Sequence, residues 1–231
     1  MNFLKEYSFI LLSGGVGKRM QLDIPKQFLL IGGKPILIHA LEKIDVIEEI
    51  KEIIIPSPKE YIEKTEEIIF HYGFSTPIHC IEGGETRQES VHKGLQQTRF
   101  ESVIIHEAVR PFVTVEEFRK LLYVDAENAI YGQDIPFTVL EGTEYIENNL
   151  HRDRLINVQL PQKFNKSKLL YAHECAKEEG RNFTEDASLF FHYFHSNIKV
   201  LAGSDYNIKI TKPIDRKIAE IIYKEYILLE G

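Results

Sequence analysis

The feature that most constrains the fold is a regular alternation of short apolar runs with longer segments of helical periodicity. The apolar runs occupy residues 7–12, 52–55, 78–81 and 102–105, and helical spacing occurs at 35–44, 59–72, 88–97 and 115–124. Short strands that alternate with helices are typical of a parallel sheet covered by helices on both faces. We therefore expect an α/β, Rossmann-like fold with a mostly parallel sheet. In such sheets ligands bind at the carboxyl ends of the strands.

The second half of the chain is less regular. Residues 133–160 contain β-rich stretches broken by turn residues, which indicate a protruding arm or hairpin. Two helices and then two strands are predicted beyond it, at 166–178, 185–194, 198–201 and 207–210. A final helix from Pro213 carries four isoleucines predicted to share one face: Ile214, Ile218, Ile221 and Ile222. No linker or repeat divides the chain, so residues 1–231 are predicted to form one domain.

Composition and charge exclude several classes of function. The 231 residues are 43% hydrophobic, yet no apolar run approaches the roughly 18–20 residues that span a bilayer. The N-terminus lacks the pattern of a signal peptide, so a cytoplasmic protein without membrane contact is expected. The formal charge of −7 argues against nucleic-acid binding. Cys80 and Cys175 stand far apart, which indicates neither a disulfide nor a zinc site.

A glycine-rich turn follows the first predicted strand. It has the sequence LSGGVGKRM at residues 12–20 and is followed by IPKQF at 24–28. Glycines after a buried strand let backbone N–H groups approach phosphate oxygens, and the nearby Arg19 and Lys26 add positive charge. The spacing matches neither a Walker A loop nor G-x-G-x-x-G. The turn therefore predicts a phosphate site of another kind.

These motifs, with three others, resemble the cytidylyltransferases that act on 2-C-methylerythritol 4-phosphate and on ribitol 5-phosphate. The further motifs are GGETRQESV at 83–91, HEAVRPF at 106–112 and NIKITKP at 207–213. Two shorter segments, QLPQKF at 159–164 and TEDAS at 184–188, fall in the same order as in the family. The resemblance covers roughly residues 7–224. It implies the fold of the nucleotide-diphospho-sugar transferases.

The resemblance also implies a role for each matching residue. Nucleotide binding is expected from eight of them: Ser13, Gly14, Gly15, Gly17, Gly84, Glu85, Ser90 and Ala108. Three cations are expected to act catalytically on the reacting phosphates: Arg19, Lys26 and Lys209. Three residues are expected to bind the polyol phosphate: Arg110, Arg152 and Thr184. Of these, Arg152 is expected to come from the arm at about 133–160, which reaches into the neighbouring subunit of a homodimer.

The implied reaction is attack by a phosphate oxygen of the polyol phosphate on the α-phosphorus of CTP, with release of pyrophosphate. Bringing two polyanions together requires positioning and charge neutralisation rather than a covalent intermediate. A magnesium ion is therefore expected, held through substrate phosphates and one carboxylate. Glu107 is the predicted ligand, where the family usually has an aspartate. His106 is expected to be structural, because a phosphate nucleophile needs no general base.

The acceptor is less well determined than the nucleotide. The methylerythritol enzymes place an aspartate directly before Asn-Ile-Lys, whereas this chain has Tyr206 there and Asp205 one residue earlier. Leu140 stands where the arm threonine of the methylerythritol branch is expected, and Leu160 replaces a threonine that is usual in both branches. TRQESVHKGL at 86–95, by contrast, resembles the methylerythritol branch. The departures at Tyr206 and Leu140 favour D-ribitol 5-phosphate as the substrate, with 2-C-methyl-D-erythritol 4-phosphate as the alternative.

Three other readings of the motifs remain open at this point. The chain could use another nucleotide or sugar phosphate, because the glycine-rich turn and the Pro-Lys segment are shared more widely. It could be a nucleotide-binding module without catalysis, which Glu107 and Tyr206 at expected metal positions favour. A dinucleotide-binding oxidoreductase is the third reading, and the missing G-x-G-x-x-G argues against it. Glu185 and Asp186 are interpreted as a helix start rather than a second metal site.

Overall fold

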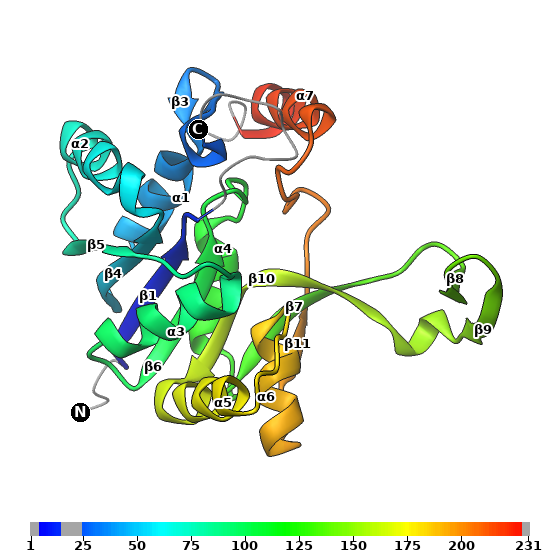
Figure 1. Cartoon of the computed structure of the whole chain (residues 1–231). Coiled ribbons are helices and arrows are strands. Elements are labelled where there is room, and N and C mark those ends of the chain that lie inside the picture. The colour runs from blue at the N-terminus through cyan, green and yellow to red at the C-terminus, as the bar shows by residue number, and fades with distance from the viewer. Residues whose placement is uncertain (1–4, 15–24, 228–231) are drawn as a thin grey trace.

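The computed structural model describes residues 5–14 and 25–227, and a seven-stranded sheet forms its centre (Figure 1). The strands are β1 (Tyr7–Leu12), β4 (Ile50–Ser57), β5 (Ile78–Glu82), β6 (Ser102–Glu107), β7 (Ala129–Asp134), β10 (Ile156–Asn165) and β11 (Lys199–Ala202). Their order across the sheet is β11-β7-β10-β6-β1-β4-β5. Of these seven strands, β10 alone runs antiparallel to its neighbours, β6 and β7. The predicted α/β fold with a mostly parallel sheet is confirmed.

Helices cover both faces of the sheet, as the alternating sequence predicted (Figure 1). One face carries α1 (Ile36–Asp45), α2 (Ile62–Tyr72) and α4 (Val115–Tyr123). The other carries α3 (Arg87–Gln97), α5 (Lys166–Glu178) and α6 (Asp186–Phe194). Phe9 and Leu11 of β1 face the first layer, while Ile10 faces the second. Burial on both faces explains why every residue of β1 except Ser8 is apolar.

The site-bearing edge of the sheet is built from sharp turns between strands and helices. The helix α3 begins at a Thr86 N-cap, whose side chain accepts a hydrogen bond from the backbone N–H of Glu89. A capping box formed by Thr114 and Glu117 begins α4. Such caps satisfy backbone donors that have no partner inside the helix. They therefore fix where each chain segment turns at the carboxyl ends of the strands.

Several short elements complete the body. A small hairpin pairs β2 (Leu30–Ile31) with β3 (Lys34–Pro35). Two 3-10 turns, η2 (Lys26–Phe28) and η3 (Lys59–Tyr61), precede this hairpin and α2 respectively. The described chain ends in α7 (Pro213–Ile222) and a π-helical turn, η5 (Tyr223–Ile227). Within the described ranges, no helix has the length and hydropathy that crossing a bilayer requires.

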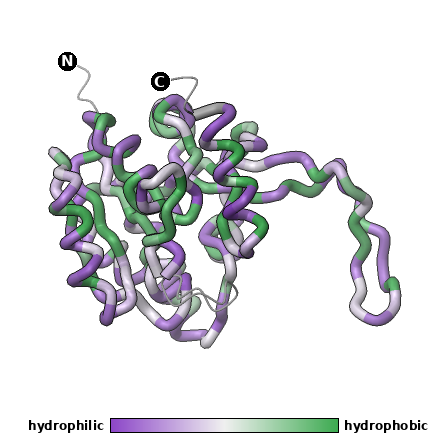
Figure 2. Tube along the Cα trace, turned by 90° about the horizontal axis from the view of Figure 1, so that it is seen from above, coloured by the Kyte–Doolittle hydropathy of each residue, from purple (hydrophilic) through white to green (hydrophobic). Residues whose placement is uncertain are grey.

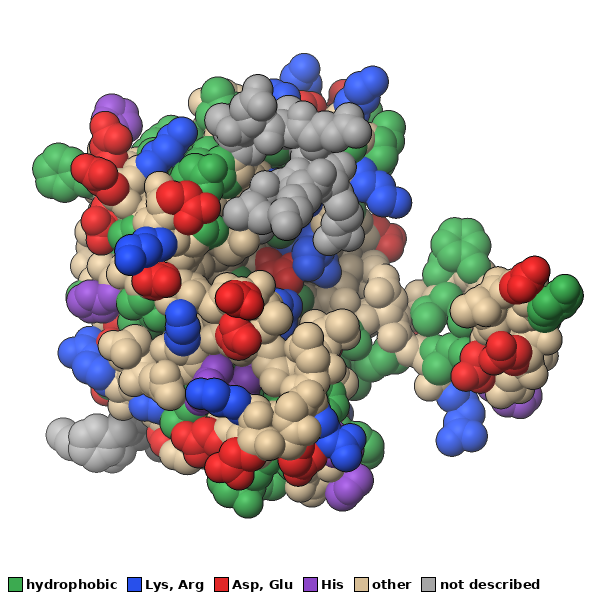
Figure 3. All heavy atoms as spheres, in the orientation of Figure 1, with side chains coloured by type: hydrophobic (Ala, Val, Ile, Leu, Met, Phe, Trp, Pro, Cys, Tyr) green, Lys and Arg blue, Asp and Glu red, His purple; other side chains and the backbone are tan. Residues whose placement is uncertain are grey.

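The predicted arm is present and projects well away from the body (Figures 1 and 2). Its stem is the paired ends of β7 and β10, and its tip is the antiparallel hairpin of β8 (Val139–Gly142) and β9 (Ile146–Leu150). A 3-10 turn, η4 (Arg152–Arg154), leads back into β10. Exposed apolar side chains cluster on the arm (Figure 3), namely Phe137, Leu140, Tyr145 and Ile146. Its role in dimerisation stays a prediction.

The prediction of a strand at residues 207–210 is wrong, because the backbone of this segment is irregular. Its N–H groups make two local turn bonds, and Ile210 alone donates across the chain, to the carbonyl of Val109. Side chains anchor it instead. The amide Nδ2 of Asn207 donates to the carbonyl of Leu160 at 2.6 Å, and Arg110 donates to the carbonyl of Asn207 at 2.9 Å. The segment therefore crosses the sheet edge without joining the sheet.

The helix α7 begins at Pro213, as predicted, but its buried face differs from the predicted one. Three of the four isoleucines, Ile214, Ile218 and Ile221, are 55%, 42% and 58% exposed. The helix instead buries Ala219 and Ile222 against a small cluster around Leu29 and Ile36. The helix was therefore predicted at the correct residues, but the face that packs against the body is the one with Ala219 and Ile222 rather than the one with most of the isoleucines.

Candidate active site

A cavity of about 220 Å³ opens at the carboxyl ends of β1 and β6. The segments that line it come from distant parts of the chain: the turn after β1, the η2 turn, the start of α3, the end of β6 and the irregular segment 207–211. The predicted motifs converge here, at the edge where a parallel sheet is expected to hold its ligand. We regard this cavity as the candidate active site.

Glu107 and Lys209 meet at the centre of this site. The Nζ of Lys209 donates to Oε1 of Glu107 at 2.9 Å and lies 2.9 Å from Oε2 as well. Arg110 and Arg87 approach the same carboxylate, with their Nε atoms 3.5 Å and 3.4 Å from its oxygens. Burial acts to raise the pKa of Glu107, but the charges of these three cations outweigh it and hold the pKa below its usual value. Glu107 is therefore ionised and surrounded by excess positive charge.

That excess of positive charge suits a polyanionic ligand. Lys26 adds another cation to the lining, and its Nζ donates to the carbonyl of Thr211 at 3.0 Å. The next residue, Gln27, is fully buried and lines the cavity. Neither polar atom of its amide has a hydrogen-bond partner in the described part of the chain. Burying an amide without partners is costly, so a ligand that satisfies it would bind more tightly.

Most of the residues predicted to bind the nucleotide line the cavity: Ser13, Gly14, Gly84, Glu85 and Ser90. The hydroxyl of Ser90 accepts a hydrogen bond from the backbone N–H of Gly84 at 3.0 Å and donates to the carbonyl of Thr86 at 2.9 Å. Gly84 has no room for a side chain, since a Cβ there would stand 2.2 Å from Cβ of Glu89. The turn therefore brings its backbone to the cavity wall. The hydroxyl of Ser13 has no partner within residues 5–14 and 25–227.

Three further predicted residues lie outside the described ranges, namely Gly15, Gly17 and Arg19.

Four predicted residues do not line the cavity. Ala108 is buried in the core beneath it. Arg110 lies beside Glu107, and its guanidinium donates a hydrogen bond to the carbonyl of Asn207. Arg110 therefore anchors the segment that carries Lys209. Thr184 is exposed and lies two residues before α6. Arg152 lies on the arm and donates to the carbonyl of Pro136 at 3.0 Å.

Glu107 can serve as a magnesium ligand in one specific way. Magnesium is commonly held through one or two carboxylates together with substrate phosphates. In the described part of the chain, no group of three or more histidine, cysteine or acidic side chains could hold a metal ion. The Oε2 of Glu107 lies 2.9 Å from Nζ of Lys209 and 3.5 Å from Nε of Arg110, so the carboxylate is already compensated by cations. The residues therefore fit a metal that arrives with a triphosphate, held by this single carboxylate.

His106 occupies a structural position. It is fully buried, its Nε2 lies 3.1 Å from the carbonyl of Arg110, and its ring packs edge-on against Phe9 and Phe118. Burial lowers the pKa of His106 to about 3, so the ring is neutral at ordinary pH. The imidazole does not reach the cavity, in keeping with the interpretation of the sequence.

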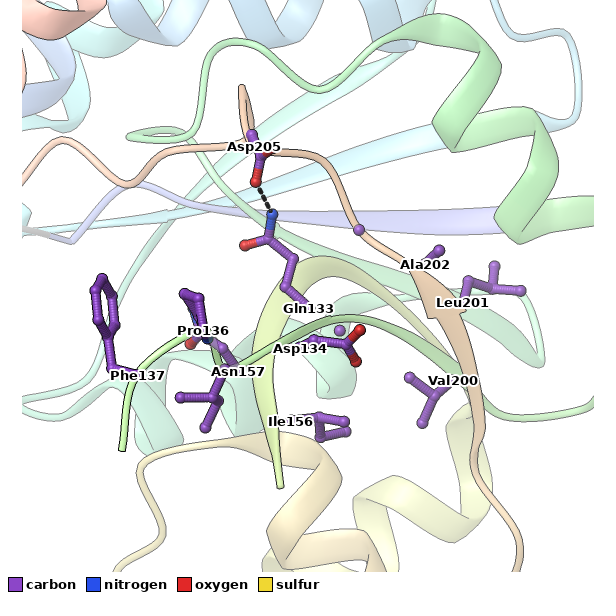
Figure 4. A pocket seen from close by; sticks show the side chains of 13 residues that line it. Gln133, Asp134, Pro136, Phe137, Ile156, Asn157, Val200, Leu201, Ala202 and Asp205 are labelled. Atoms are coloured by element: carbon purple, nitrogen blue, oxygen red, sulfur yellow. Dashed lines mark hydrogen bonds between the residues drawn. The ribbon is translucent and has the colours of Figure 1, made fainter. Parts of the chain in front are cut away.

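A larger cavity, of about 860 Å³, lies at the base of the arm (Figure 4). Its walls come from the ends of β7, β10 and β11, with Phe137, Ile156 and Val200 among the apolar lining. Asp205 lies here, where it accepts a hydrogen bond from Gln133 at 2.8 Å. Asp205 therefore lines this cavity and not the smaller one. The described residues that line this cavity include no lysine or arginine, so we assign the chemistry to the smaller one.

Arg87 was not predicted from the sequence as a site residue. This side chain lines the active-site cavity and joins Glu107 to Asp186, the first residue of α6. A signal was present, because an arginine directly after a threonine that can cap a helix stands at a helix start, where its charge opposes the helix dipole. Glu185 and Asp186 do begin a helix, as interpreted, with Glu185 as the N-cap. Asp186 also pairs with Arg87, a contact that the spacing of residues in the sequence could not reveal.

Comparisons with known proteins give a consistent set of relatives. A family model described as 2-C-methyl-D-erythritol 4-phosphate cytidylyltransferase matches residues 8–225. An enzyme of that name from Halalkalibacterium halodurans is 35% identical over 225 residues, covering 95% of this chain and 98% of its own length. Another, from Chlorobium phaeovibrioides, is 34% identical over 234 residues and covers 93% and 95%. The crystal structure of 4-diphosphocytidyl-2C-methyl-D-erythritol synthase from Anaerococcus prevotii matches with a TM-score of 0.83 at 28% identity, covering 95% of this chain and 96% of that one.

Proposed function

This chain belongs to the 2-C-methyl-D-erythritol 4-phosphate cytidylyltransferase family, and we propose that it transfers CMP from CTP to 2-C-methyl-D-erythritol 4-phosphate. Family membership makes it a CTP-dependent cytidylyltransferase, and the identity of the acceptor is what we propose beyond that. The observation that carries it is the family match over residues 8–225. Relatives named for this substrate favour it over ribitol 5-phosphate, which the departures at Tyr206 and Leu140 had favoured.

The cations of the cavity account for the chemistry. A phosphate oxygen of the acceptor attacks the α-phosphorus, the bond to the bridging oxygen breaks, and its electron pair leaves with pyrophosphate. Lys26 and Lys209 both line the cavity and are proposed to neutralise charge that grows on the oxygens of the α-phosphate and of the leaving group. Gly84, Glu85 and Ser90 are proposed to hold the nucleoside, and Ser13 and Gly14 the triphosphate. Alignment of the attacking phosphate oxygen with the α-phosphorus supplies the rest of the rate acceleration.

We propose that magnesium accompanies CTP, held by Glu107. When bound, the ion supplies charge neutralisation on the phosphates. Glu107 already has three cationic neighbours, so a further dication is favourable only together with the several negative charges of a triphosphate. We therefore expect metal binding to depend strongly on CTP. Calorimetric titration with magnesium, without and with CTP, tests this, and tight binding without nucleotide would contradict it.

We propose that the arm completes the site of a second copy of the chain. Arg152 lies on the arm, whereas the other predicted acceptor residues lie on the body. The arm also exposes Phe137, Tyr145 and Ile146, each more than 70% accessible, which a partner would cover. Mixing two inactive variants, Arg152→Ala and Lys209→Met, should restore activity, because a mixed dimer contains one site that lacks neither residue. Failure to restore it, or a monomer by light scattering, would contradict the proposal.

Pyrophosphate release tests the activity itself. The enzyme should release pyrophosphate with CTP and 2-C-methyl-D-erythritol 4-phosphate, and the same assay with ATP, GTP or UTP should show little turnover. Ribitol 5-phosphate is the matched competitor. A higher kcat/KM with ribitol 5-phosphate would reject the proposed acceptor while leaving cytidylyl transfer intact. No turnover with either acceptor would favour a nucleotide-binding module without catalysis.

A further inference from the structure

Arg87 bridges two buried carboxylates that belong to different elements. Its Nε donates to Oε1 of Glu107 at 3.4 Å, and its Nη2 lies 2.7 Å from Oδ2 of Asp186. Both carboxylate side chains are nearly inaccessible, at 7% and 2% exposure. Glu107 ends the central strand β6, while Asp186 is the first residue of α6. One guanidinium therefore ties a strand end to a helix start.

Helix stability does not explain this arrangement. Arg87 is the first residue of α3, where a positive charge opposes the helix dipole. The Thr86 side chain already caps α3, and the Glu185 side chain already caps α6 by accepting from the N–H groups of Asp186 and Ala187. Neither helix start thus needs the Arg87–Asp186 pair. The pair must serve the relative placement of the segments that it joins.

Those segments carry the two halves of the proposed site. Glu107 lies in the nucleotide cavity in contact with Lys209. Asp186 begins α6, and Thr184, a predicted acceptor residue, lies two positions before it. Lys209, Glu107, Arg87 and Asp186 thus form a continuous chain of charges from one half to the other. A planar guanidinium can serve two carboxylates at once, which a single ammonium group does poorly.

We infer that Arg87 is a positioning residue that couples the nucleotide half of the site to the acceptor half by fixing the start of α6 relative to Glu107. This inference rests on the proposed function and deepens it. Arg87 has no need to touch either substrate in this role. Its loss should disturb the acceptor half more than nucleotide binding, because Lys26, Gly84 and Ser90 still line the cavity.

Steady-state kinetics with matched variants tests the coupling. We expect Arg87→Lys and Asp186→Asn each to lower kcat/KM for the acceptor by roughly 10²-fold, mainly through KM, since a displacement of about 1 Å has such an effect. The double variant should be no worse than either single one, because both break the same link. Nucleotide affinity, measured by calorimetry with CTP alone, should change by less than about threefold, or roughly 0.6 kcal/mol.

Arg99 offers the control. It pairs with the buried carboxylate of Glu52 at 2.6 Å, so Arg99→Lys disturbs a similar pair, on residues that do not line the cavity. Its kinetics should match the wild type. If Arg87→Lys behaves like Arg99→Lys while the wild type turns over CTP, the inference is overturned and the proposed function stands. If the wild type itself shows no turnover, the proposed function fails instead.

Hydrogen exchange tests the inference without relying on a variant that folds. Adding CTP alone to the wild type should slow amide exchange in a peptide covering residues 184–190, because nucleotide binding orders Glu107 and, through Arg87, the start of α6. Arg87→Lys should lose this response if it folds. Unchanged exchange at 184–190 in the wild type, with protection at residues 83–91, would overturn the coupling while showing that the nucleotide had bound.

Discussion

Replacing Lys209 by methionine should remove most of the turnover and little of the stability. Methionine keeps the length of the side chain and removes its charge. Two unit charges 4 Å apart in a medium with an effective dielectric constant of 20 interact by about 4 kcal/mol. The Lys209 side chain is 38% exposed, so screening by water reduces this value. We expect a loss of about 3 kcal/mol in transition-state stabilisation, which corresponds to a fall of roughly 10²-fold in kcat.

The fold should tolerate this change because Glu107 keeps two other cationic neighbours. Arg87 and Arg110 remain 3.4 Å and 3.5 Å from its carboxylate oxygens. We therefore expect a loss of less than about 1 kcal/mol in the free energy of unfolding. The assay is pyrophosphate release at saturating CTP, with urea unfolding measured on the same preparations.

Lys168 provides the matched control. It is also partly exposed and pairs with a carboxylate, Glu127, at 2.6 Å, but it lies on α5 and does not line the cavity. Lys168→Met should therefore have wild-type kcat. If kcat of the Lys209→Met enzyme lies within about threefold of kcat of the Lys168→Met enzyme, the assignment of Lys209 to the reacting phosphates is refuted. A fall in kcat matched by an equal loss of folded protein would refute it too.

Three other predictions follow from the described contacts. Glu107→Asp should lower magnesium-dependent kcat roughly tenfold, because the shorter side chain withdraws from Arg87 and Lys209; equal or higher activity would show that the longer side chain is dispensable. Gly94→Val should destabilise the fold by about 1–3 kcal/mol in urea unfolding, since even a Cβ at this position lies 3.1 Å from Ile10; an unchanged midpoint would contradict this. His106 has a pKa of about 3 in the folded protein and near 6.5 in the unfolded chain. Its contribution to the free energy of unfolding should therefore fall as the pH drops below about 6.5, by up to ~1.4 kcal/mol per pH unit. Unfolding of His106→Phe between pH 6.5 and 4.5 should show a correspondingly shallower slope, and an equal slope would exclude this origin.

Local patterns predicted much of the fold because each element carries its own periodicity. The apolar run at residues 7–12 coincides with β1, and the helix expected from Pro35 is α1. The same reasoning failed at 207–210, where Ile208 and Ile210 alternate as in a strand. Whether such a segment joins a sheet depends on a neighbouring strand edge, and here Asn207 and Arg110 hold it elsewhere.

The candidate site was predicted in part for a related reason. Motifs identified Lys26, Glu107 and Lys209, which the fold brings to one cavity. Arg87 lay in a quoted motif, but its partner Asp186 is distant in the sequence, so no spacing could indicate the pair. The face of α7 was misjudged because periodicity defines an apolar stripe but not the neighbour that covers it.

The position of β10 in the sheet has a consequence for synthesis of the chain. The first four strands of the core, β1, β4, β5 and β6, are complete by Glu107, whereas β10, which pairs with the free edge of β6, ends only at Asn165. At about 5–20 residues per second, a ribosome leaves that edge open for several seconds. Val103, Ile104 and Ile105 of β6 are buried in the finished protein, so the nascent strand exposes apolar side chains as well as an unpaired edge. Chains that stop within the arm should therefore aggregate, and the arm must be synthesised and turned back before the core can close.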